Sequence, residues 1–238
     1  MSEAKFTILV PIYDEADNME RLSKTLYEYI QKASLPTKVL FINDGSKDDS
    51  LSLIKKACHS YDGLHFISLA ENRGLSGAIK AGIQFTETQF VGYIDADLQT
   101  HPDDFELLIP HINDFELVTG IRTGRKDSFV KNFSSKFANG YRKLFTKDGI
   151  TDTGCPLKIM HTINAKEIPM FKGMHRFIPA LIQIQNGKVK QIPVRHFPRI
   201  AGEAKYHLWN RLVGPFFDCW IFLWMKKRFI NYQIAEKG

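Results

Sequence analysis

Two aspartates and a glutamine follow a short apolar run near the middle of the chain, and these residue types can do chemistry together. The run from Phe90 to Ile94 has the pattern of a buried strand, and Asp95, Asp97 and Gln99 come directly after it. Two carboxylates this close repel each other unless a cation lies between them, and a divalent cation with hard oxygen ligands fits. The alternative is a polar turn whose aspartates cap a helix, and these residues alone leave both interpretations open.

The first 122 residues alternate between β-rich runs and helical patterns, and these elements must position the aspartates. Short connections between alternating elements are typical of a mostly parallel, doubly wound sheet in a single Rossmann-like α/β domain. The predicted strands cover residues 6–10, where Pro11 is expected to stop the strand, 38–42, 64–69, 90–94 and 115–120. The predicted helices cover 19–30, a segment capped by Asp48 or Asp49, 72–85 and a short turn from Pro102.

Polar groups follow several of these strands. Asp14 and Glu15 follow the first strand, Asp44 the second and Arg73 the third. Ligands of open α/β sheets bind at the carboxyl ends of the strands, so we expect these groups to converge with the aspartates after the fourth strand. The sequence has no glycine-rich dinucleotide fingerprint, no phosphate-binding P-loop and no nucleophile elbow, which leaves those site types without support.

The second half of the chain has a different pattern and the opposite charge. Residues 1–120 carry 10 Lys/Arg and 19 Asp/Glu, whereas residues 121–238 carry 22 Lys/Arg and 7 Asp/Glu, which gives the net charge of +6. A basic half indicates an anionic partner, although a solvated basic surface is the alternative. The pattern predicts a basic helix with an aromatic side at 128–147, a loop and short strand at 151–160, a helix at 175–185 and a strand at 189–196.

The C-terminal segment, residues 207–238, is rich in Trp and Phe. Leu212 to Met225 is apolar, but it is shorter than the ~20 residues of a spanning helix and it contains Pro215 and Asp218. Aromatic residues followed by the basic run 226–228 favour an amphipathic helix lying in a membrane interface. The alternative is a helix packed on the domain, with its basic residues in water.

Short motifs occur in order between residues 10 and 206. They are Val10-Pro11-Ile12-Tyr13-Asp14-Glu15, Asn43-Asp44-Gly45-Ser46, Asn72-Arg73-Gly74-Leu75-Ser76-Gly77-Ala78, Asp95-Ala96-Asp97-Leu98-Gln99, Asp152-Thr153-Gly154-Cys155, His175-Arg176-Phe177 and Gly202-Glu203-Ala204-Lys205-Tyr206. With them the chain resembles family 2 glycosyltransferases, and most closely the branch of dolichyl-phosphate mannosyltransferases and bacterial polyprenyl-phosphate glycosyltransferases. The resemblance implies a GT-A type domain over residues 1–206, with a nucleotide-sugar-binding half at 1–122 and an acceptor-binding half at 123–206.

The resemblance also implies roles for the matching residues. Cleavage of the bond between a sugar and a diphosphate builds negative charge on the leaving group, which a divalent cation and an arginine stabilise. Asp97, Arg122 and Asp152 are the expected catalytic residues. The donor nucleotide is expected at Pro11, Tyr13, Glu15, Asp44, Arg73 and Asp95, and Mg²⁺ or Mn²⁺ at Asp95, Asp97 and Gln99.

The acceptor residues depart in part from the branch. The acceptor phosphate is expected at Lys131, Ser135, Arg199 and Lys205, with Lys126, Arg142 and Lys143 as further cations. Lys131 stands where the branch has arginine, which weakens two-pronged recognition of a phosphate. The sequence Gly202-Glu203-Ala204-Lys205 replaces the usual Gly-Arg-Ser-Lys. Asp152 is either a base for a hydroxyl acceptor or the residue that holds the acceptor loop, and the second role suits a phosphate acceptor.

The resulting expectation is an inverting, metal-dependent glycosyltransferase that moves a sugar from a GDP- or UDP-linked donor to a polyprenyl phosphate. The alternatives are a hydroxyl acceptor on a glycan or lipid, and a non-catalytic basic binding or scaffold protein. Three cysteines without a disulfide pattern and an N-terminus without a signal pattern favour the cytoplasm, peripheral to the inner membrane face. A membrane-embedded partner subunit is plausible, and no nucleic acid is expected.

Overall fold

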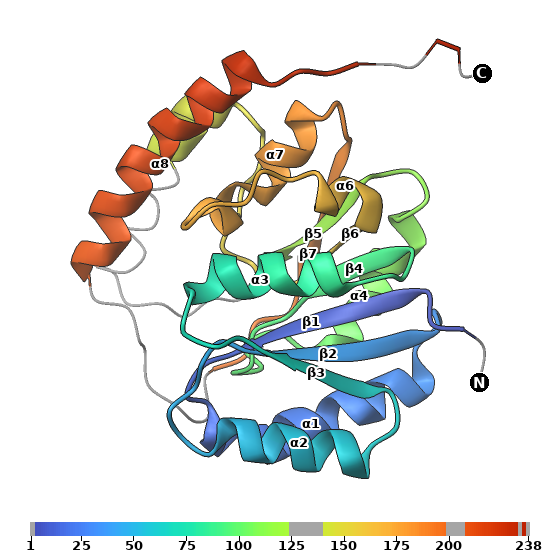
Figure 1. The fold of residues 1–238 in the computed structure, drawn as a ribbon. Coiled ribbons are helices and arrows are strands. Elements are labelled where there is room, and N and C mark those ends of the chain that lie inside the picture. The colour runs from blue at the N-terminus through green and yellow to red at the C-terminus, as the bar shows by residue number, and fades with distance from the viewer. Residues whose placement is uncertain (1–2, 124–139, 199–207, 233–234, 237–238) are drawn as a thin grey trace.

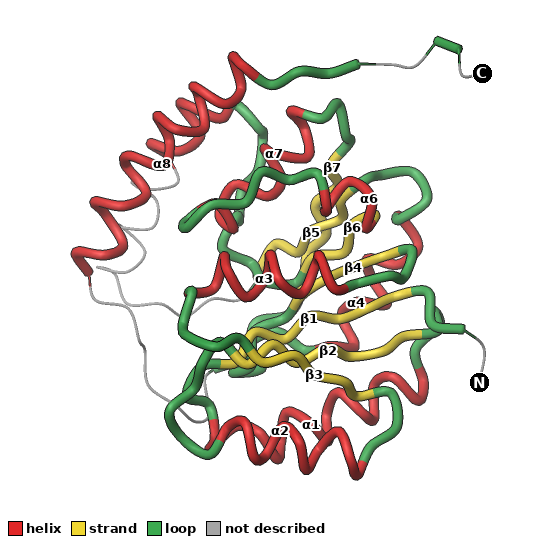
Figure 2. Tube along the Cα trace, viewed as in Figure 1, coloured by secondary structure: helices red, strands yellow, loops and turns green. Residues whose placement is uncertain are grey.

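A seven-stranded sheet runs through the centre of the molecule, in the order β3-β2-β1-β4-β6-β5-β7 (Figure 1). The computed structural model describes residues 3–123, 140–198, 208–232 and 235–236, with side chains of the last helix from Phe216 onward. Figure 2 shows the strands as one central layer with helices around it. The strands are β1 (Phe6–Ile12), β2 (Thr37–Asn43), β3 (Leu64–Ser68), β4 (Phe90–Tyr93), β5 (Leu117–Arg122), β6 (Lys158–His161) and β7 (Val189–Val194).

Helices cover both faces of the sheet, which explains why the central strands are almost continuously apolar. One apolar core packs α1 (Ala16–Lys32), α2 (Ser50–Ser60) and α4 (Phe105–Leu108) against one face. The second core packs α3 (Gly74–Phe85), α6 (Thr162–Lys166), α7 (Ile178–Ile184) and α8 (Leu208–Arg228) against the other. The predicted α/β fold with a mostly parallel sheet is confirmed.

One strand runs against the others. β1, β2, β3 and β4 are parallel neighbours, and β5 is parallel to β7, but β6 pairs antiparallel with both β4 and β5. The sheet is therefore mostly parallel, as predicted, with β6 as its reversed strand. The amino end of β6, at Lys158, consequently lies at the edge where the other strands have their carboxyl ends.

Pro11 does not stop the first strand, contrary to the expectation from the sequence. β1 continues to Ile12, and Pro11 lies opposite Ile42 of β2. On the other side, β4 pairs with β1 only as far as Leu9, opposite Tyr93. Proline lacks a backbone N–H, and it is tolerated here because no ladder partner continues beside it on the β4 side.

The last helix, α8, packs one face on the domain and leaves another exposed. Cys219, Phe222 and Met225 are buried in the second core, and Phe222 stacks on Phe177 with ring centroids 5.5 Å apart. In Figure 1, α8 lies along the outside of the molecule. Among the described residues, no helix has the length and apolar character needed to cross a membrane.

Candidate functional site

The turn after β4 holds Asp95 and Asp97. Asp97 is only 7% exposed, and its Oδ1 accepts the backbone N–H of Gln99 at 3.0 Å. Leu98, between Asp97 and Gln99, has a positive φ of 53°, a conformation that tight polar turns impose. The turn thus fixes the Asp97 carboxylate, while Asp95 is half-buried beside it.

The donor set of this turn fits Mg²⁺ or Mn²⁺. The two carboxylates and one amide provide hard oxygen ligands, the type that these ions prefer. Among the described residues no cluster of three or more His, Cys, Asp or Glu is placed to hold a metal. Mg²⁺ is usually bound through one or two protein carboxylates, with phosphate oxygens and water in the other positions, and the two aspartates of this turn could supply such carboxylates.

A chain of polar contacts on α1 joins this turn to the loop after β1. Arg21 donates from Nη2 to the backbone carbonyl of Asp97 at 3.1 Å and to Asn18 Oδ1 at 3.3 Å. Asn18 in turn donates from Nδ2 to Glu15 Oε2 at 2.7 Å. Sequence reasoning missed Arg21, although residues 18 and 21 are three apart on one helical face and could have signalled it. Glu15, a predicted nucleotide contact, is thereby tied to the predicted metal turn.

The loops after β1 and β2 are fastened together. Asp14 has a positive φ of 49°, and its Oδ1 accepts the backbone N–H of Lys47 at 2.7 Å. Ser46 accepts the N–H of Asp14 at 3.1 Å, and Ser50 accepts the N–H of Glu15 at 2.9 Å. A hollow between these loops has a mainly acidic lining, which suits hydroxyl and N–H donors of a ribose or base rather than a phosphate. The predicted nucleotide contacts Pro11 and Tyr13 are half-buried at this end of β1.

Asp44 caps the helix that follows β3. Its side chain is 3% exposed, and Oδ1 accepts the backbone N–H of Arg73 at 2.7 Å. Burial raises the pKa of Asp44, whereas the N–H groups of Arg73 and Gly74 oppose that rise. The Arg73 side chain forms an exposed ion pair with Glu71. Asp44 thus joins the β2 and β3 loops, as the convergence of strand ends predicts.

Ser76 and His175 connect α3 to the segment ahead of α7. Ser76 Oγ accepts the backbone N–H of Gly173 at 3.1 Å and lies 2.7 Å from His175 Nδ1. Burial lowers the pKa of His175 to about 3, so this ring is neutral at physiological pH.

Arg122 and Asp152 form the strongest charged contact at the site edge. Asp152 Oδ2 accepts from Arg122 Nε at 2.8 Å and from its backbone N–H at 3.1 Å, and Asp152 Oδ1 accepts from Nη2 at 2.8 Å. Only 14% of the arginine side chain and 12% of the aspartate side chain are exposed. This two-pronged geometry fixes the guanidinium plane at the end of β5. Sequence reasoning named both residues but did not predict that they pair.

The pair also changes both pKa values. Burial would raise the pKa of Asp152, but the hydrogen bonds and charge of Arg122 hold it below its ordinary value. Burial disfavours the charged form of Arg122, yet the hydrogen bonds and charge of Asp152 raise its pKa overall, with Asp95 adding to that rise. A carboxylate that is held in three hydrogen bonds with a low pKa is a poor general base. This geometry favours the anchoring role of Asp152 over the base role.

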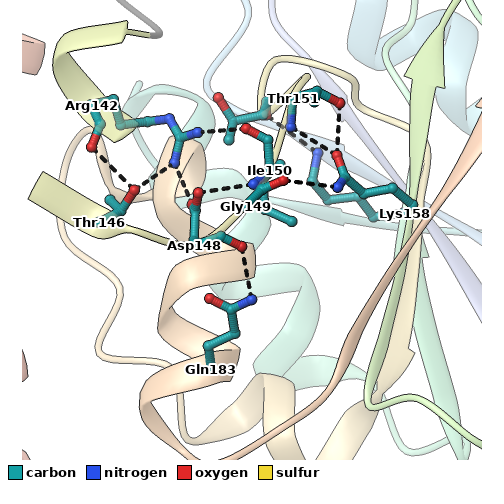
Figure 3. Close-up of polar contacts among 10 residues, drawn as sticks. Arg142, Thr146, Asp148, Gly149, Ile150, Thr151, Lys158 and Gln183 are labelled. Carbon is teal, nitrogen blue, oxygen red and sulfur yellow. Dashed lines mark hydrogen bonds and ion pairs between the residues drawn. The ribbon is translucent and has the colours of Figure 1, made fainter. Parts of the chain in front are cut away.

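Arg142 is buried and is not available to bind an acceptor phosphate, contrary to the expectation from the sequence. It is 5% exposed and forms a buried ion pair with Asp148, and its Nη2 donates to the carbonyl of Ile150 at 3.0 Å. Gln183 of α7 donates to the carbonyl of Asp148 at 3.0 Å, so the network fastens the loop ahead of Asp152 (Figure 3). The arginine that looked available to a phosphate is instead structural, because its partner six residues away folds back onto it.

The other predicted acceptor residues, Lys131, Ser135, Arg199 and Lys205, lie outside the described residues, as does Lys126. The chain that leads into residues 199–207 is described, however. Phe197 donates its N–H to the carbonyl of Gln99 at 2.9 Å, and Arg195 binds the buried Asp104 through its backbone N–H at 2.8 Å and its Nε at 2.7 Å. The segment after β7 is therefore tied to the turn that carries Asp95, Asp97 and Gln99. Arg195 was not singled out from the sequence.

Comparisons with known proteins agree with this geometry. The model of the family described as "Glycosyl transferase family 2" matches residues 7–165. An undecaprenyl-phosphate 4-deoxy-4-formamido-L-arabinose transferase from Salmonella choleraesuis is 30% identical over 223 residues, which cover 90% of this chain. The chain spans 66% of the length of that relative.

Solved structures of glycosyltransferases share the fold. Glucosyl-3-phosphoglycerate synthase from Mycobacterium tuberculosis, solved with Mn²⁺, UDP-glucose and phosphoglyceric acid, has a TM-score of 0.69 at 11% identity, covering 97% of this chain and 82% of that chain. A mannosyltransferase from Pyrobaculum calidifontis, solved with GDP-mannose and Mn²⁺, has a TM-score of 0.63 at 18% identity, covering 87% and 60%. These matches confirm the GT-A type fold, and with the family match over residues 7–165 they mean that the chain belongs to glycosyl transferase family 2.

Proposed function

We propose that this protein transfers a sugar from a nucleotide diphosphate sugar to a polyprenyl phosphate, with inversion at the anomeric carbon and with Mg²⁺ or Mn²⁺. The observation that carries the proposal is the pair of Arg122 and Asp152. It supplies an oriented cation for a diphosphate, and it leaves Asp152 poorly suited to deprotonate a hydroxyl. The curated relative is named for an undecaprenyl-phosphate acceptor, which supports the same acceptor class here.

The donor half would bind and orient the nucleotide sugar. Glu15 and the acidic hollow beside it offer acceptors to the ribose and base, and Asp95 and Asp97 would hold the cation, with the Gln99 amide beside them. That cation supplies charge stabilisation to the diphosphate when bound. Arg122 would meet the negative charge that develops on the departing diphosphate, and Asp152 keeps its guanidinium in place for that purpose.

The acceptor chemistry follows from the acidity of a phosphate. A phosphate monoester has a second pKa near ~6 and is largely ionised at neutral pH, so it attacks without a base. What it needs is cationic groups that hold it near the donor. We assign that task to Lys131, Ser135, Arg199 and Lys205, which the sequence places in the basic half and just beyond β7.

The acceptor lipid would be reached at a membrane surface. We call Phe216, Phe217, Trp220, Ile221 and Trp224 of α8 the aromatic face, since all of these side chains are exposed. Its rings continue onto the helix ending at Thr146, where Tyr141 stacks on Phe216 with centroids 4.8 Å apart and Phe145 meets Trp220 at 5.4 Å. Exposed Lys226, Lys227 and Arg228 follow it. An apolar face with basic residues at its end suits the interface of an anionic membrane.

A panel of donors and acceptors tests the proposal. The protein is incubated with UDP- and GDP-sugars, Mn²⁺, and either a short polyprenyl phosphate or the matching polyprenol, and lipid products are separated by chromatography. A glycosylated polyprenyl phosphate that needs Mn²⁺ and is lost in Asp97→Asn is the expected result. A product from the polyprenol alone would shift the acceptor to a hydroxyl, and metal-dependent donor binding without any product would leave a binding protein. Either result would overturn the proposal.

A further inference from the structure

Lys158 is completely buried beneath the candidate site, and the proposed reaction does not use it directly. Lys158 begins β6 and lies opposite Tyr93 of β4 and Thr119 of β5, with a relative exposure of 0%. Lysine is almost never fully buried without a partner, because moving an ammonium out of water is costly. The contacts of the Lys158 ammonium must therefore offset the cost of its burial.

The contacts of the ammonium point to the loop that carries Asp152. Nζ donates to the backbone carbonyl of Cys155 and, at 3.5 Å, to that of Thr153, and it lies 5.3 Å from the centroid of the Tyr93 ring. Within the described chain, no carboxylate forms an ion pair with it. Lys158 therefore binds the main chain just after Asp152, the residue that holds Arg122.

The loop is also restrained by contacts of its own backbone and by its approach to Arg122. The N–H of Cys155 reaches the carbonyl of Asp152 at 3.4 Å, a long hydrogen bond. Gly154 lies so close to Arg122 that an added Cβ would be 3.0 Å from Nη2, so the path of the loop determines the space available to the guanidinium. The two hydrogen bonds from Lys158 Nζ add to these contacts, since Gly120 also donates its N–H to the carbonyl of Leu157 at 2.8 Å, and Cys155 and Leu157 are buried in the core that packs α1, α2 and α4.

We propose that Lys158 is a positioning residue for the transferase reaction, which holds the Thr153–Cys155 loop so that Asp152 can keep Arg122 aligned with the donor diphosphate. This inference rests on the proposed function, because it assigns Arg122 to the diphosphate. Lys158 reaches neither donor nor acceptor, since its side chain is fully buried. Burial lowers the pKa of Lys158 and the charge of Arg122 adds to that fall, whereas the nearby Cys155, Asp152 and Asp95 oppose it.

The test compares Lys158→Met, which removes the ammonium at similar volume, with Lys158→Gln, which keeps an uncharged donor. Loss of two hydrogen bonds from a charged donor should lower kcat by about 10- to 100-fold in the Met variant, with a smaller loss in the Gln variant. The Kd for nucleotide should stay within about threefold, because the other donor contacts remain. The matched control is Lys190→Met on β7, where Nζ also lies over a ring, 5.7 Å from the centroid of Phe115, and unchanged kcat is expected.

Hydrogen–deuterium exchange gives a readout that does not depend on activity. In Lys158→Met, amides of the Asp152–Leu157 segment should exchange faster, whereas those of β2 should be unchanged. Faster exchange everywhere would mean a general structural role, and unchanged exchange or unchanged kcat would also overturn the inference. If the wild type makes no lipid product, the proposed function fails by itself, and the exchange comparison still decides whether Lys158 holds the loop. If the Met variant does not fold, the Gln variant supplies the same comparison.

Discussion

Substitution of Asp152 by asparagine tests the central contact of the site. Asparagine can accept from only one side of Arg122, and its NH₂ group faces a guanidinium that has no acceptor, so the two-pronged contact is lost. Both side chains are largely buried. Breaking such a pair leaves an uncompensated charge, and we expect the free energy of unfolding to fall by about 3 to 5 kcal/mol.

The assay is urea and thermal unfolding followed by circular dichroism. For a domain of this size the expected loss corresponds to a fall in Tm of roughly 6 to 20 °C. The matched control is Asp103→Asn, which removes a partly exposed ion pair with Lys32 at 3.0 Å and should cost less than about 1 kcal/mol. A stability of Asp152→Asn equal to that of the control would refute the reasoning.

The pH dependence of the same variant gives a second check. The pKa of Asp152 is lowered in the folded state from its ordinary value of 3.8. A carboxylate with a lowered folded pKa contributes stability above its unfolded pKa and loses it as the pH falls through the folded pKa. The difference in stability between wild type and Asp152→Asn should therefore be constant above pH 3.8 and shrink below it. A difference that stays constant through this acid range would contradict the assignment.

Three further predictions concern other parts of the molecule. Asp97→Asn should weaken Mn²⁺-dependent nucleotide binding by about 100-fold or more, measured by calorimetry with EDTA as the control. Loss of a residue that only supports a metal ligand typically costs about 10- to 100-fold in affinity, and loss of the ligand itself should cost more. Arg142→Met leaves Asp148 buried and unpaired and should lower the free energy of unfolding by about 3 to 5 kcal/mol in urea, and an unchanged midpoint would contradict this. Replacing Trp220 and Trp224 by alanine should reduce sedimentation with anionic vesicles and leave nucleotide binding intact, and equal sedimentation would exclude the aromatic face as the contact.

The elements of the first 122 residues were predictable because the sequence patterns that identify them are local. Alternating apolar runs and helical patterns identify β1 to β5, and the parallel arrangement then brings Asp44 and Asp95 to one edge. The reversal of β6 was not predictable, since a four-residue strand that begins with lysine gives no sign of its direction or its neighbours. Its place between β4 and β5 depends on pairing across many residues.

The charged residues of the acceptor half were the hardest to assign. Arg142 has the sequence context of an exposed basic helix, yet Asp148 folds back and buries it. Lys158 lies in the segment where the sequence predicts only a loop and a short strand, and it is fully enclosed. Arg122 and Asp152 were named separately, and their pairing across 30 positions needed the three-dimensional fold. The contact of Arg122 with Asp152 is tertiary, and the shorter contacts of Arg142 with Asp148 and of Lys158 with Cys155 depend on how the chain folds back, which a helical or strand pattern does not contain.

The reversed direction of β6 brings both ends of the segment between β5 and β6 to one edge of the sheet. β5 leaves the sheet at Arg122, and the neighbouring antiparallel β6 returns at Lys158, at the same edge. Residues 123–157 are thus topologically the connection of a single hairpin, with both stems fixed in the sheet. A chimera that exchanges this connection with that of a relative would therefore have to keep Asp152, because its contact with Arg122 joins the connection to the end of β5.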